Sequence, residues 1–463
     1  MLIVGGNQSA AGGYNVDNSL RFNSGSSDYL QWNSSPSGNR QKFTYSVWFK
    51  RSSVGNTQIL ASASFSGSDE GYLFLSGGGA LGWQSTNGGD GNISTTRLFK
   101  DFSAWYHLVW SVDTTQATAS NRMKFYINGV QETSFSTETY PNQNQSLYWN
   151  VGGTYYPYIG RRAGGDYFNG YMAEVVHINN QQLDPTSFGE FDEDSSIWKP
   201  IDVSGLTFGT TGYYLPFENS AALGQDDSGN GNDFTVNNLT SIDQSTDTCT
   251  NNFATWNRLI PPTFTNHNLL DGNLTVEGET SSQNTAFSTI AVSSGKWFCE
   301  MKLTVEGNAT SSVPNFGIAS TADFRHADSE AYYETSGTNI YAGRVNSAQI
   351  NRNGSDSGTD LSSTPDVGDI IGLALDLDSG TKTLKFYLNG SLVGTVNINT
   401  DEYCFICAVK EDDNKATVQG NFGGTNTYTV SSGNSDGNGY GNFEYSVPSG
   451  YYALNTKNLA EYG

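Results

Sequence analysis

Two stretches of the sequence resemble each other: HLVWSVD at 107–113 with RMKFYING at 122–129, and IIGLALDLD at 370–378 with LKFYLNG at 384–390. In each, an apolar run reaches an aspartate, a polar connection follows, and a second run contains Lys-Phe-Tyr and ends in Asn-Gly. Alternating apolar residues indicate a strand with one buried face, and Asn-Gly between two strands favours a two-residue turn. The repeat therefore predicts two β-sandwiches of related architecture.

The rest of the chain has the same pattern of short alternating runs separated by Gly, Asn and Ser. In KFTYSVWFK, for example, Phe43, Tyr45 and Val47 share one face of a strand. Spacings of about ten residues between such runs are typical of antiparallel sandwiches. We therefore expect an all-β chain of two antiparallel, jelly-roll-like sandwiches in tandem. Seven Asn-Gly pairs are candidate hairpin turns, with asparagine at 87, 128, 169, 230, 353, 389 and 438.

The amino-acid composition indicates a folded chain, and the net charge disfavours some kinds of partner. Of 463 residues, 36% are hydrophobic and 13% aromatic, and the aromatic content indicates a folded chain. The 46 acidic and 23 basic residues give a net charge of −23, which disfavours nucleic acid and anionic lipid as partners. No run approaches the roughly 20 apolar residues of a membrane span, and MLIVGGNQSAAGG lacks the basic region of a secretory signal. We expect a protein made in the cytoplasm, with no membrane insertion.

The sequence suggests four parts. Residues 1–18 are rich in glycine and carry one charge, which predicts a short flexible arm that could anchor the protein. Residues 19–204 form the first sandwich, and its only plausible helical turn begins at Asp184-Pro185. Residues 205–262 are interpreted as connecting strands and a linker that ends at a proline pair, and 263–463 as the second sandwich.

Both halves resemble known folds. In residues 19–200 the runs SLRFNSGSSDYLQW, FTYSVWFKR, WYHLVWSVD, MKFYING and FNGYMAEVVHI resemble the laminin-G-like or concanavalin-A-like jelly roll. In the second half, GKWFCEMKL, NFGIAS and VGDIIGLALDLDSGTKTLKFYLNG resemble the SPRY sandwich, although Cys299 departs from its usual aromatic strand. These resemblances imply the two folds and no particular ligand.

The whole arrangement resembles virion proteins of tailed bacteriophages, especially marine ones, and DSGNGNDFTVNNL and PSGYYALNTKNL also carry this resemblance. It implies a virion surface protein of the tail-fibre, head-fibre or capsid-decoration type, made in the host cytoplasm. Its partners would be other virion proteins and, for an adhesin, a host-surface glycan or receptor. The alternative is a purely structural decoration protein that contacts virion subunits alone. A homo-oligomer is compatible with both.

The sequence argues against catalysis. Some jelly rolls of this class are glucanases with an E-x-D-x-x-E strand, and Glu190 and Asp192 resemble its start. The third acid is missing, because Ser195 stands in its place. The four histidines lie far apart, and the four cysteines fit buried thiols better than a zinc site, because Cys404 and Cys407 would point to opposite faces of one strand. We therefore expect a protein that is not an enzyme.

Aromatic residues among polar ones are the best candidates for ligand binding. Sugar rings stack on exposed aromatic rings while neighbouring amides and carboxylates bind their hydroxyls. Core packing is the alternative for some of these residues. The candidate ligand-binding residues are Trp83, Tyr148, Trp149, Tyr155, Tyr156, Tyr158 and Asp166.

One loop, DDSGNGND at 226–233, is rich in side-chain oxygens. Such loops bind calcium through carboxylate and amide oxygens, but the same residues also form turns stabilised by their own side chains. Both interpretations remain open, and no other cofactor is expected. The candidate calcium ligands are Asp226, Asp227, Asn230 and Asn232.

Overall fold

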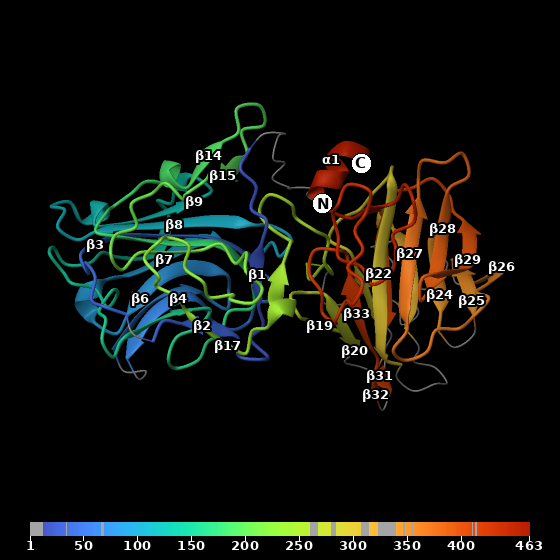
Figure 1. Ribbon diagram of the computed structural model, residues 1–463, viewed down its shortest axis with the longest axis horizontal. Coiled ribbons are helices and arrows are strands. Elements are labelled where there is room, and N and C mark those ends of the chain that lie inside the picture. Colours follow the sequence, from blue (N-terminus) through green and yellow to red (C-terminus); the bar gives the residue numbers. More distant parts are fainter. Residues whose placement is uncertain are drawn as a thin grey trace. The chain divides into compact units, whose positions relative to one another are not determined.

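The structure is a computed structural model that describes residues 13–463 except 34, 66–68, 260–266, 279–283, 307–313, 323–338, 346–347, 354, 410 and 413. The chain divides into two compact units, with the boundary between Asn251 and Asn252. Almost all regular structure is β-strand, which confirms the predicted all-β class (Figure 1). In the described part of the chain, no helix has the length and apolar character needed to cross a membrane.

The first unit is a sandwich of two antiparallel sheets. The first sheet has the order β10-β9-β8-β3-β13-β1-β18, with β16 also paired to β13, and the second has the order β11-β7-β6-β5-β4-β12-β2-β17. The first sheet comprises β1 (Ser19–Phe22), β3 (Lys42–Arg51), β8 (Tyr106–Asp113), β9 (Met123–Ile127), β10 (Val130–Gln131), β13 (Gly170–Asn179), β16 (Tyr213–Leu215) and β18 (Gln244–Ser245). The second comprises β2 (Tyr29–Gln31), β4 (Gln58–Phe65), β5 (Asp69–Leu75), β6 (Ala80–Ser85), β7 (Asn92–Leu98), β11 (Phe135–Thr139), β12 (Tyr156–Ile159) and β17 (Thr235–Asn237).

The second unit also contains two large sheets. Their orders are β19-β20-β33-β22-β27-β28-β29, with β34 parallel to β22, and β21-β30-β23-β24-β25-β26. The first of them comprises β19 (His267–Leu270), β20 (Thr275–Gly278), β22 (Lys296–Val305), β27 (Ile370–Asp376), β28 (Thr383–Leu388), β29 (Ser391–Asn397), β33 (Thr417–Asn421) and β34 (Tyr452–Ala453). The other comprises β21 (Asn284–Phe287), β23 (Asn315–Ser320), β24 (Ile340–Arg344), β25 (Gln349–Arg352), β26 (Ser355–Asp360) and β30 (Tyr403–Val409).

The two sandwiches share one topology. The order β10-β9-β8-β3-β13-β1 in the first unit matches β29-β28-β27-β22-β33-β20 in the second, and β7-β6-β5-β4-β12-β2 matches β26-β25-β24-β23-β30-β21. In both units the matched strands also follow one another in the same order along the chain. The related architecture predicted from the repeated sequence is therefore confirmed, and it extends to twelve strands in each unit.

The repeated stretches form the same hairpin in both units. Asn128 and Asn389 begin the turns with φ of 48° and 47°. The Asn128 side chain accepts a hydrogen bond from the backbone N–H of His107 (2.8 Å), and Asn389 accepts one from that of Ile370 (3.0 Å). Each asparagine therefore joins the turn to the start of the strand before the hairpin, β8 in the first unit and β27 in the second. Among the other Asn-Gly pairs, Asn353 also has a positive φ, between β25 and β26.

An ion pair at the other end of these strands is also repeated. Lys42 of β3 lies opposite Asp113 of β8, with 2.9 Å between Nζ and the carboxylate. Lys296 of β22 lies opposite Asp376 of β27, at 3.0 Å. The aspartate that ends each apolar run thus pairs with the first residue of the neighbouring strand.

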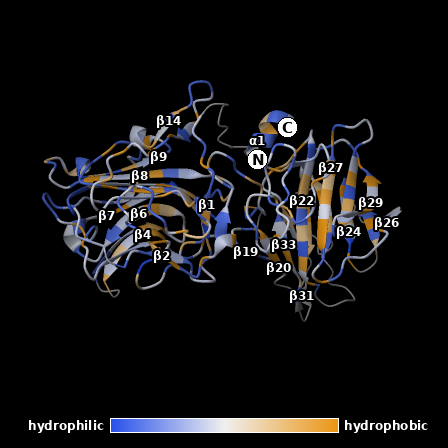
Figure 2. Ribbon diagram, in the orientation of Figure 1, coloured by the Kyte–Doolittle hydropathy of each residue, from blue (hydrophilic) through white to orange (hydrophobic). Residues whose placement is uncertain are grey.

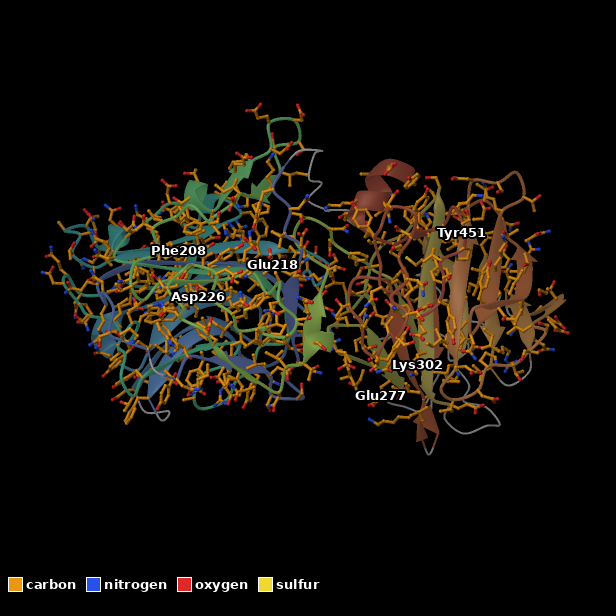
Figure 3. The ribbon with its side chains drawn as sticks, viewed as in Figure 1. Phe208, Glu218, Asp226, Glu277, Lys302 and Tyr451 are labelled. Carbon is orange, nitrogen blue, oxygen red and sulfur yellow. The ribbon has the colours of Figure 1, made fainter. Side chains whose placement is uncertain are left out.

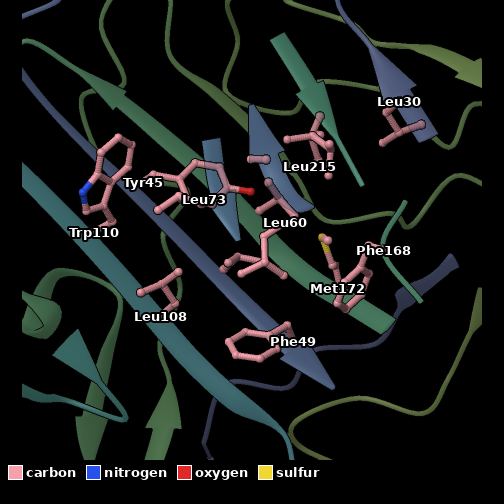
Figure 4. Close-up of a cluster of buried hydrophobic side chains, with 14 of the residues drawn as sticks. Leu30, Tyr45, Phe49, Leu60, Leu73, Leu108, Trp110, Phe168, Met172 and Leu215 are labelled. Atoms are coloured by element: carbon pink, nitrogen blue, oxygen red, sulfur yellow. The ribbon is translucent and has the colours of Figure 1, made fainter. Parts of the chain in front are cut away.

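Each core lies between the two sheets of its unit. In the first unit Tyr45, Leu73 and Trp110 are among the buried side chains, and they converge from both sheets (Figure 4). In the second unit both sheets again contribute, with Trp297 of β22 and Phe405 of β30 among the core residues, and β27 is one of the strands coloured as hydrophobic (Figure 2).

The structure revises the predicted divisions of the chain. Residues 205–251 belong to the first unit, because β16, β17 and β18 pair with β13, β2 and β1. Residues 14–18 of the predicted arm also belong to it, since Val16 is buried and exchanges hydrogen bonds with Thr250. The arm's residues 1–12 lie outside the described part. The strands β16, β17 and β18 have only two or three residues each, too few to show clear alternation in the sequence.

Two helical segments bear on the sequence analysis. Asp184 does cap a short 3-10 helix, η3 (Pro185–Ser187), and accepts from the N–H of Thr186, as predicted. A second helical segment was missed: α1 (Thr456–Tyr462) is capped by the side chain of Asn455, which accepts from the N–H of Asn458.

In both units one segment covers the outward face of the first sheet. It is the segment that follows β13 in the first unit and β33 in the second. In the first unit Lys50 forms a fully buried ion pair with Asp247 of the covering segment. Trp105 donates its indole N–H to the same carboxylate (3.2 Å), and the Lys50 ammonium lies 5.0 Å from the Tyr171 ring. Asp247 compensates a charge that would otherwise be buried alone.

A buried carboxylate in each unit fixes the covering segment. Glu174 accepts hydrogen bonds from the hydroxyls of Tyr214 (2.9 Å) and Tyr14 (3.2 Å). Glu300 accepts from the backbone N–H groups of Glu444 (2.9 Å) and Tyr445 (2.8 Å). Burial raises the pKa of both carboxyls to about 7, against the lowering effect of these hydrogen bonds.

Candidate ligand-binding face of the first sandwich

A row of polar and aromatic side chains crosses the outward face of the second sheet of the first unit. Strand register places six residues opposite one another, and alternation places their core-facing neighbours, such as Leu30, Leu73 and Ile159, on the other side. We call these six residues the outward row. In strand order β6, β5, β4, β12, β2 and β17 they are Gln84, Tyr72, Ser62, Tyr158, Gln31 and Thr235.

The chemistry of the outward row suits a ligand with hydroxyl groups. Gln84 and Thr235 at its ends are exposed, Tyr72 and Gln31 are half-buried, and Ser62 and Tyr158 at its centre are buried. Two rings, two amides and two hydroxyls therefore alternate over six adjacent strands. Tyrosine hydroxyls are protonated donors at neutral pH, and burial raises the pKa of both Tyr72 and Tyr158 further.

Arg161 lies among three tyrosine rings beside this row. Its guanidinium carbon is 4.4 Å from the ring centre of Tyr29, 5.3 Å from that of Tyr158 and 5.1 Å from that of Tyr167. Its Nε donates to the carbonyl of Arg162 (2.8 Å), and its Nη2 to that of Ala163 (2.8 Å). These contacts hold the guanidinium against the aromatic surface.

Arg162 has a different role. It forms ion pairs with Glu70 and with Asp166 (2.7 Å), and its guanidinium carbon is 5.0 Å from the Tyr72 ring centre. Burial acts to lower the pKa of Arg162, but its hydrogen bonds with Asp166 and Glu70 raise it above the ordinary value. The Glu70 side chain is almost fully buried, and Ser64 also donates to it (3.3 Å). Arg162 therefore compensates both carboxylates at this site.

Two of the residues predicted to bind a ligand belong to the core instead. Trp83 is fully buried, stacks on Trp110 (4.6 Å between ring centres) and donates its indole N–H to the carbonyl of Asp90. Trp149 is 4% exposed and packs edge-on against Trp110 (5.0 Å). Neither ring has a free face for a sugar, so assigning them as ligand-binding residues was wrong.

The other predicted residues divide between two places. Tyr156 and Tyr158 share the outward face of β12. Asp166 lies near that face, where it forms an ion pair with Arg162. Tyr155 precedes Tyr156, so alternation directs it to the opposite side. There its half-buried ring stacks on that of Tyr148 (5.8 Å between ring centres).

Sequence reasoning missed Tyr29 and Tyr72 as members of the site, and it did not include Arg161 and Arg162, which follow the aromatic segment, among the candidate ligand-binding residues. The signal that could have found Tyr72 is the alternation of GYLFL, where the outward position holds a tyrosine. Tyr29 and Arg161 become neighbours only because β2 pairs with β12, which lies more than a hundred residues further along the chain.

The acidic residues proposed as a glucanase remnant lie elsewhere. Glu190 is on β14 (Gly189–Phe191), which pairs only with β15 (Trp198–Pro200) in a two-stranded sheet. Lys199 bridges Glu190 (3.3 Å) and Asp192 (3.1 Å). Neither carboxylate therefore lies on a large sheet.

His107, His177 and the four cysteines fit structural roles. His107 and His177 are buried, which lowers the pKa of each to about 3. The nitrogens of His107 contact the Ser46 hydroxyl (2.8 Å) and the Trp198 indole (2.9 Å). All four cysteines are buried free thiols. Cys404 and Cys407 lie in separate apolar clusters on opposite faces of β30, as predicted.

The candidate calcium loop is closed by its own hydrogen bonds (Figure 3 labels Asp226). The Asp226 carboxylate accepts from the backbone N–H groups of Tyr214, Ser228 and Asn232, at 2.8 to 2.9 Å. Asn230 and Asn232 donate their side-chain N–H to backbone carbonyls, and Asp227 accepts from Gln225 (2.7 Å). Across the described residues, no group of three or more His, Cys, Asp or Glu side chains is placed to hold a metal ion. The geometry matches the alternative of side-chain-stabilised turns.

Comparisons with known proteins agree with the fold of the first unit. A family model described as Laminin_G_3, concanavalin A-like lectin/glucanases superfamily, matches residues 24–186, a range that contains Arg161 and five residues of the outward row. No curated protein matches the chain in sequence.

Three solved structures are similar to part of the chain. The SPRY domain of human HERC1 is 13% identical, with a TM-score of 0.29 over 36% of this chain and 95% of that chain. A heptameric SAP-like pentraxin from Limulus polyphemus is 16% identical, with a TM-score of 0.28 over 37% and 79%. The carbohydrate-binding module CBM66 from Bacillus subtilis is 17% identical, with a TM-score of 0.22 over 31% and 82%.

Proposed function

We propose that this chain is a carbohydrate-binding protein without catalytic activity, and that its glycan lies along the outward row. The observation that carries the proposal is the alternation of rings, amides and hydroxyls across six adjacent strands. Tyrosine rings offer apolar faces to sugar rings, and amide groups exchange hydrogen bonds with sugar hydroxyls. The match of residues 24–186 to a lectin and glucanase superfamily supports the same ligand class.

The charges at the site support binding rather than hydrolysis. Glycosidases generally need one carboxylic acid that donates a proton and a second carboxylate that acts as base or nucleophile. Here Glu70 and Asp166 both pair with Arg162, so neither is available to protonate a leaving group. We therefore propose that bound glycan is released unchanged.

We also propose that the protein is exposed on a virion of a tailed bacteriophage, where the outward row would bind a host-surface glycan. This part rests on the sequence resemblance of the whole arrangement. Immunogold labelling of intact particles should place the protein at their surface. Labelling without any glycan binding would favour a purely structural decoration protein.

The glycan proposal is tested by single substitutions in the full-length chain. We expect Gln84→Ala and Gln31→Ala to weaken binding to glycans found on an array by at least about tenfold, because each removes an amide from the row. Gln131→Ala is the matched control, since Gln131 is an exposed glutamine on β10 of the other sheet. Equal effects of all three substitutions would refute the proposed site, and release of reducing ends would refute the absence of catalysis.

A further inference from the structure

We infer that Arg161 selects sugars that carry a carboxylate, so the glycan at the outward row is acidic. This inference rests on the proposed function and adds the class of ligand. The guanidinium lies among the rings of Tyr29, Tyr158 and Tyr167, and Tyr158 is itself a member of the row.

Hydrogen-bonding capacity is the first reason. A guanidinium has five N–H groups, and Arg161 donates one from Nε and one from Nη2, both to carbonyl oxygens. Its half-buried side chain retains donors on Nη1 and Nη2. These donors form the planar fork that binds both oxygens of a carboxylate.

Charge compensation is the second reason. Within the described part of the chain, Arg161 has no ion pair with a carboxylate. Its neighbour Arg162 binds both Glu70 and Asp166. The acidic groups of the site are therefore already paired with another arginine, and a ligand carboxylate would complete the same arrangement at Arg161.

Aromatic surroundings are the third reason. Rings at 4.4 to 5.3 Å exclude part of the water around the guanidinium, which strengthens its interaction with an anion. They also offer an apolar surface to the sugar ring that bears the carboxylate. A neutral sugar would use the rings but leave the cation without an ionic partner.

The total charge limits the kind of acidic glycan. A net charge of −23 repels densely charged polyanions such as heavily sulfated chains. A short glycan with an isolated uronic-acid or sialic-acid residue places one carboxylate at Arg161 with less repulsion. We therefore favour carboxylated sugars over sulfated or phosphorylated ones.

The test compares ligands that differ only in this group. Titration calorimetry of the unmodified full-length protein would use a digalacturonate and its methyl ester, then sialyllactose and its methyl ester. We expect at least one acidic sugar to bind about tenfold or more tightly than its neutral partner, with the preference decreasing at high salt. Equal affinities within both pairs would overturn the inference, as would equally tight binding of a sulfated analogue.

Substitutions then assign the preference to Arg161. Arg161→Gln should remove the preference for the acid while retaining binding of the neutral sugar, and Arg161→Lys should retain part of it. Arg122→Gln is the matched control, because the Arg122 guanidinium also donates to backbone carbonyls, those of Gln116, Ala117 and Pro141. An unchanged preference in folded Arg161→Gln would overturn the inference.

The outcomes separate the two proposals. If neutral and acidic sugars bind equally at the outward row, only the role of Arg161 fails. If no sugar binds, the proposed function fails with it. If Arg161→Gln does not fold, the comparison of acid and ester in the unmodified protein still decides.

Discussion

The two sandwiches have the same strand order but opposite chemistry on the outward face of their second sheets. In the first unit, β4, β5 and β12 carry hydroxyls, a carboxylate and tyrosines on this face. In the second, the matching strands β23, β24 and β30 carry Ala319, Ile340, Cys404 and Ile406, which form a buried apolar cluster. A shared topology therefore fixes where a face lies and not what it binds. The polar row marks the first unit as the one that carries the proposed site.

The contrast between core and outward face predicts the largest effect. Trp149→Ala should lower the free energy of unfolding of the first unit by about 3–5 kcal/mol, because its ring packs between Phe43, Tyr45 and Trp110. Tyr156→Ala, at a half-buried outward position, should cost less than about 1 kcal/mol. Scanning calorimetry should show a lower unfolding temperature for the first unit and an unchanged one for the second. A small effect of Trp149→Ala would place that ring outside the core.

The buried carboxylates predict the next effect. Because the pKa of Glu174 is raised from 4.5 to about 7, its folded form binds the proton more tightly, and stability falls as pH rises between these values. Glu174→Gln should therefore match the wild type near pH 4 and exceed it by about 2–3 kcal/mol at pH 8. Denaturant titrations across this range would measure the difference.

The second unit provides the comparison for this effect. Both carboxylate oxygens of Glu300 accept hydrogen bonds from backbone N–H groups. The side-chain amide of a glutamine would point its own N–H toward one of these donors. Glu300→Gln should gain less stability at pH 8 than Glu174→Gln. A larger gain at Glu300 would contradict the assigned hydrogen bonds.

The repeated turns predict a smaller effect of equal size in both units. Asn128→Ala and Asn389→Ala should each cost about 1–2 kcal/mol, since alanine tolerates a positive φ poorly and cannot accept the strand N–H. Glycine at either position should cost less, because it restores the backbone conformation. Thermal unfolding would compare the pair. Costs that differ by more than about 1 kcal/mol would show that the two hairpins are not equivalent.

The repeated ion pairs predict the smallest effect. Lys42→Met and Lys296→Met should each change stability by less than about 1 kcal/mol, because both lysine side chains are roughly one-third exposed. The changes should decrease further in 1 M salt. A loss above 2 kcal/mol in one unit would reveal a role that its counterpart lacks.

Local sequence was sufficient for the hairpins and insufficient for the site. The predicted turns depended on Asn-Gly between alternating runs, a signal contained within about twenty residues. In YWNVGGTYYPYI the alternation is interrupted by Gly152 and Gly153, both at positive φ, so the sequence did not reveal that Trp149 points inward and Tyr158 outward. Arg161 and Tyr29 meet only through strand pairing across the sheet.

The ion pair of Lys50 and Asp247 also joins two residues that a ribosome translates far apart in time. These residues are 197 positions apart, and β1 must likewise wait for β13 and β18. At about 5–20 residues per second, a ribosome needs roughly 10–40 s between translating the lysine and its partner. During this interval the ammonium must stay hydrated, because burying it alone would be strongly unfavourable. The first sheet therefore completes its covering layer only after most of its strands have left the ribosome, and the nascent chain exposes that apolar face until then.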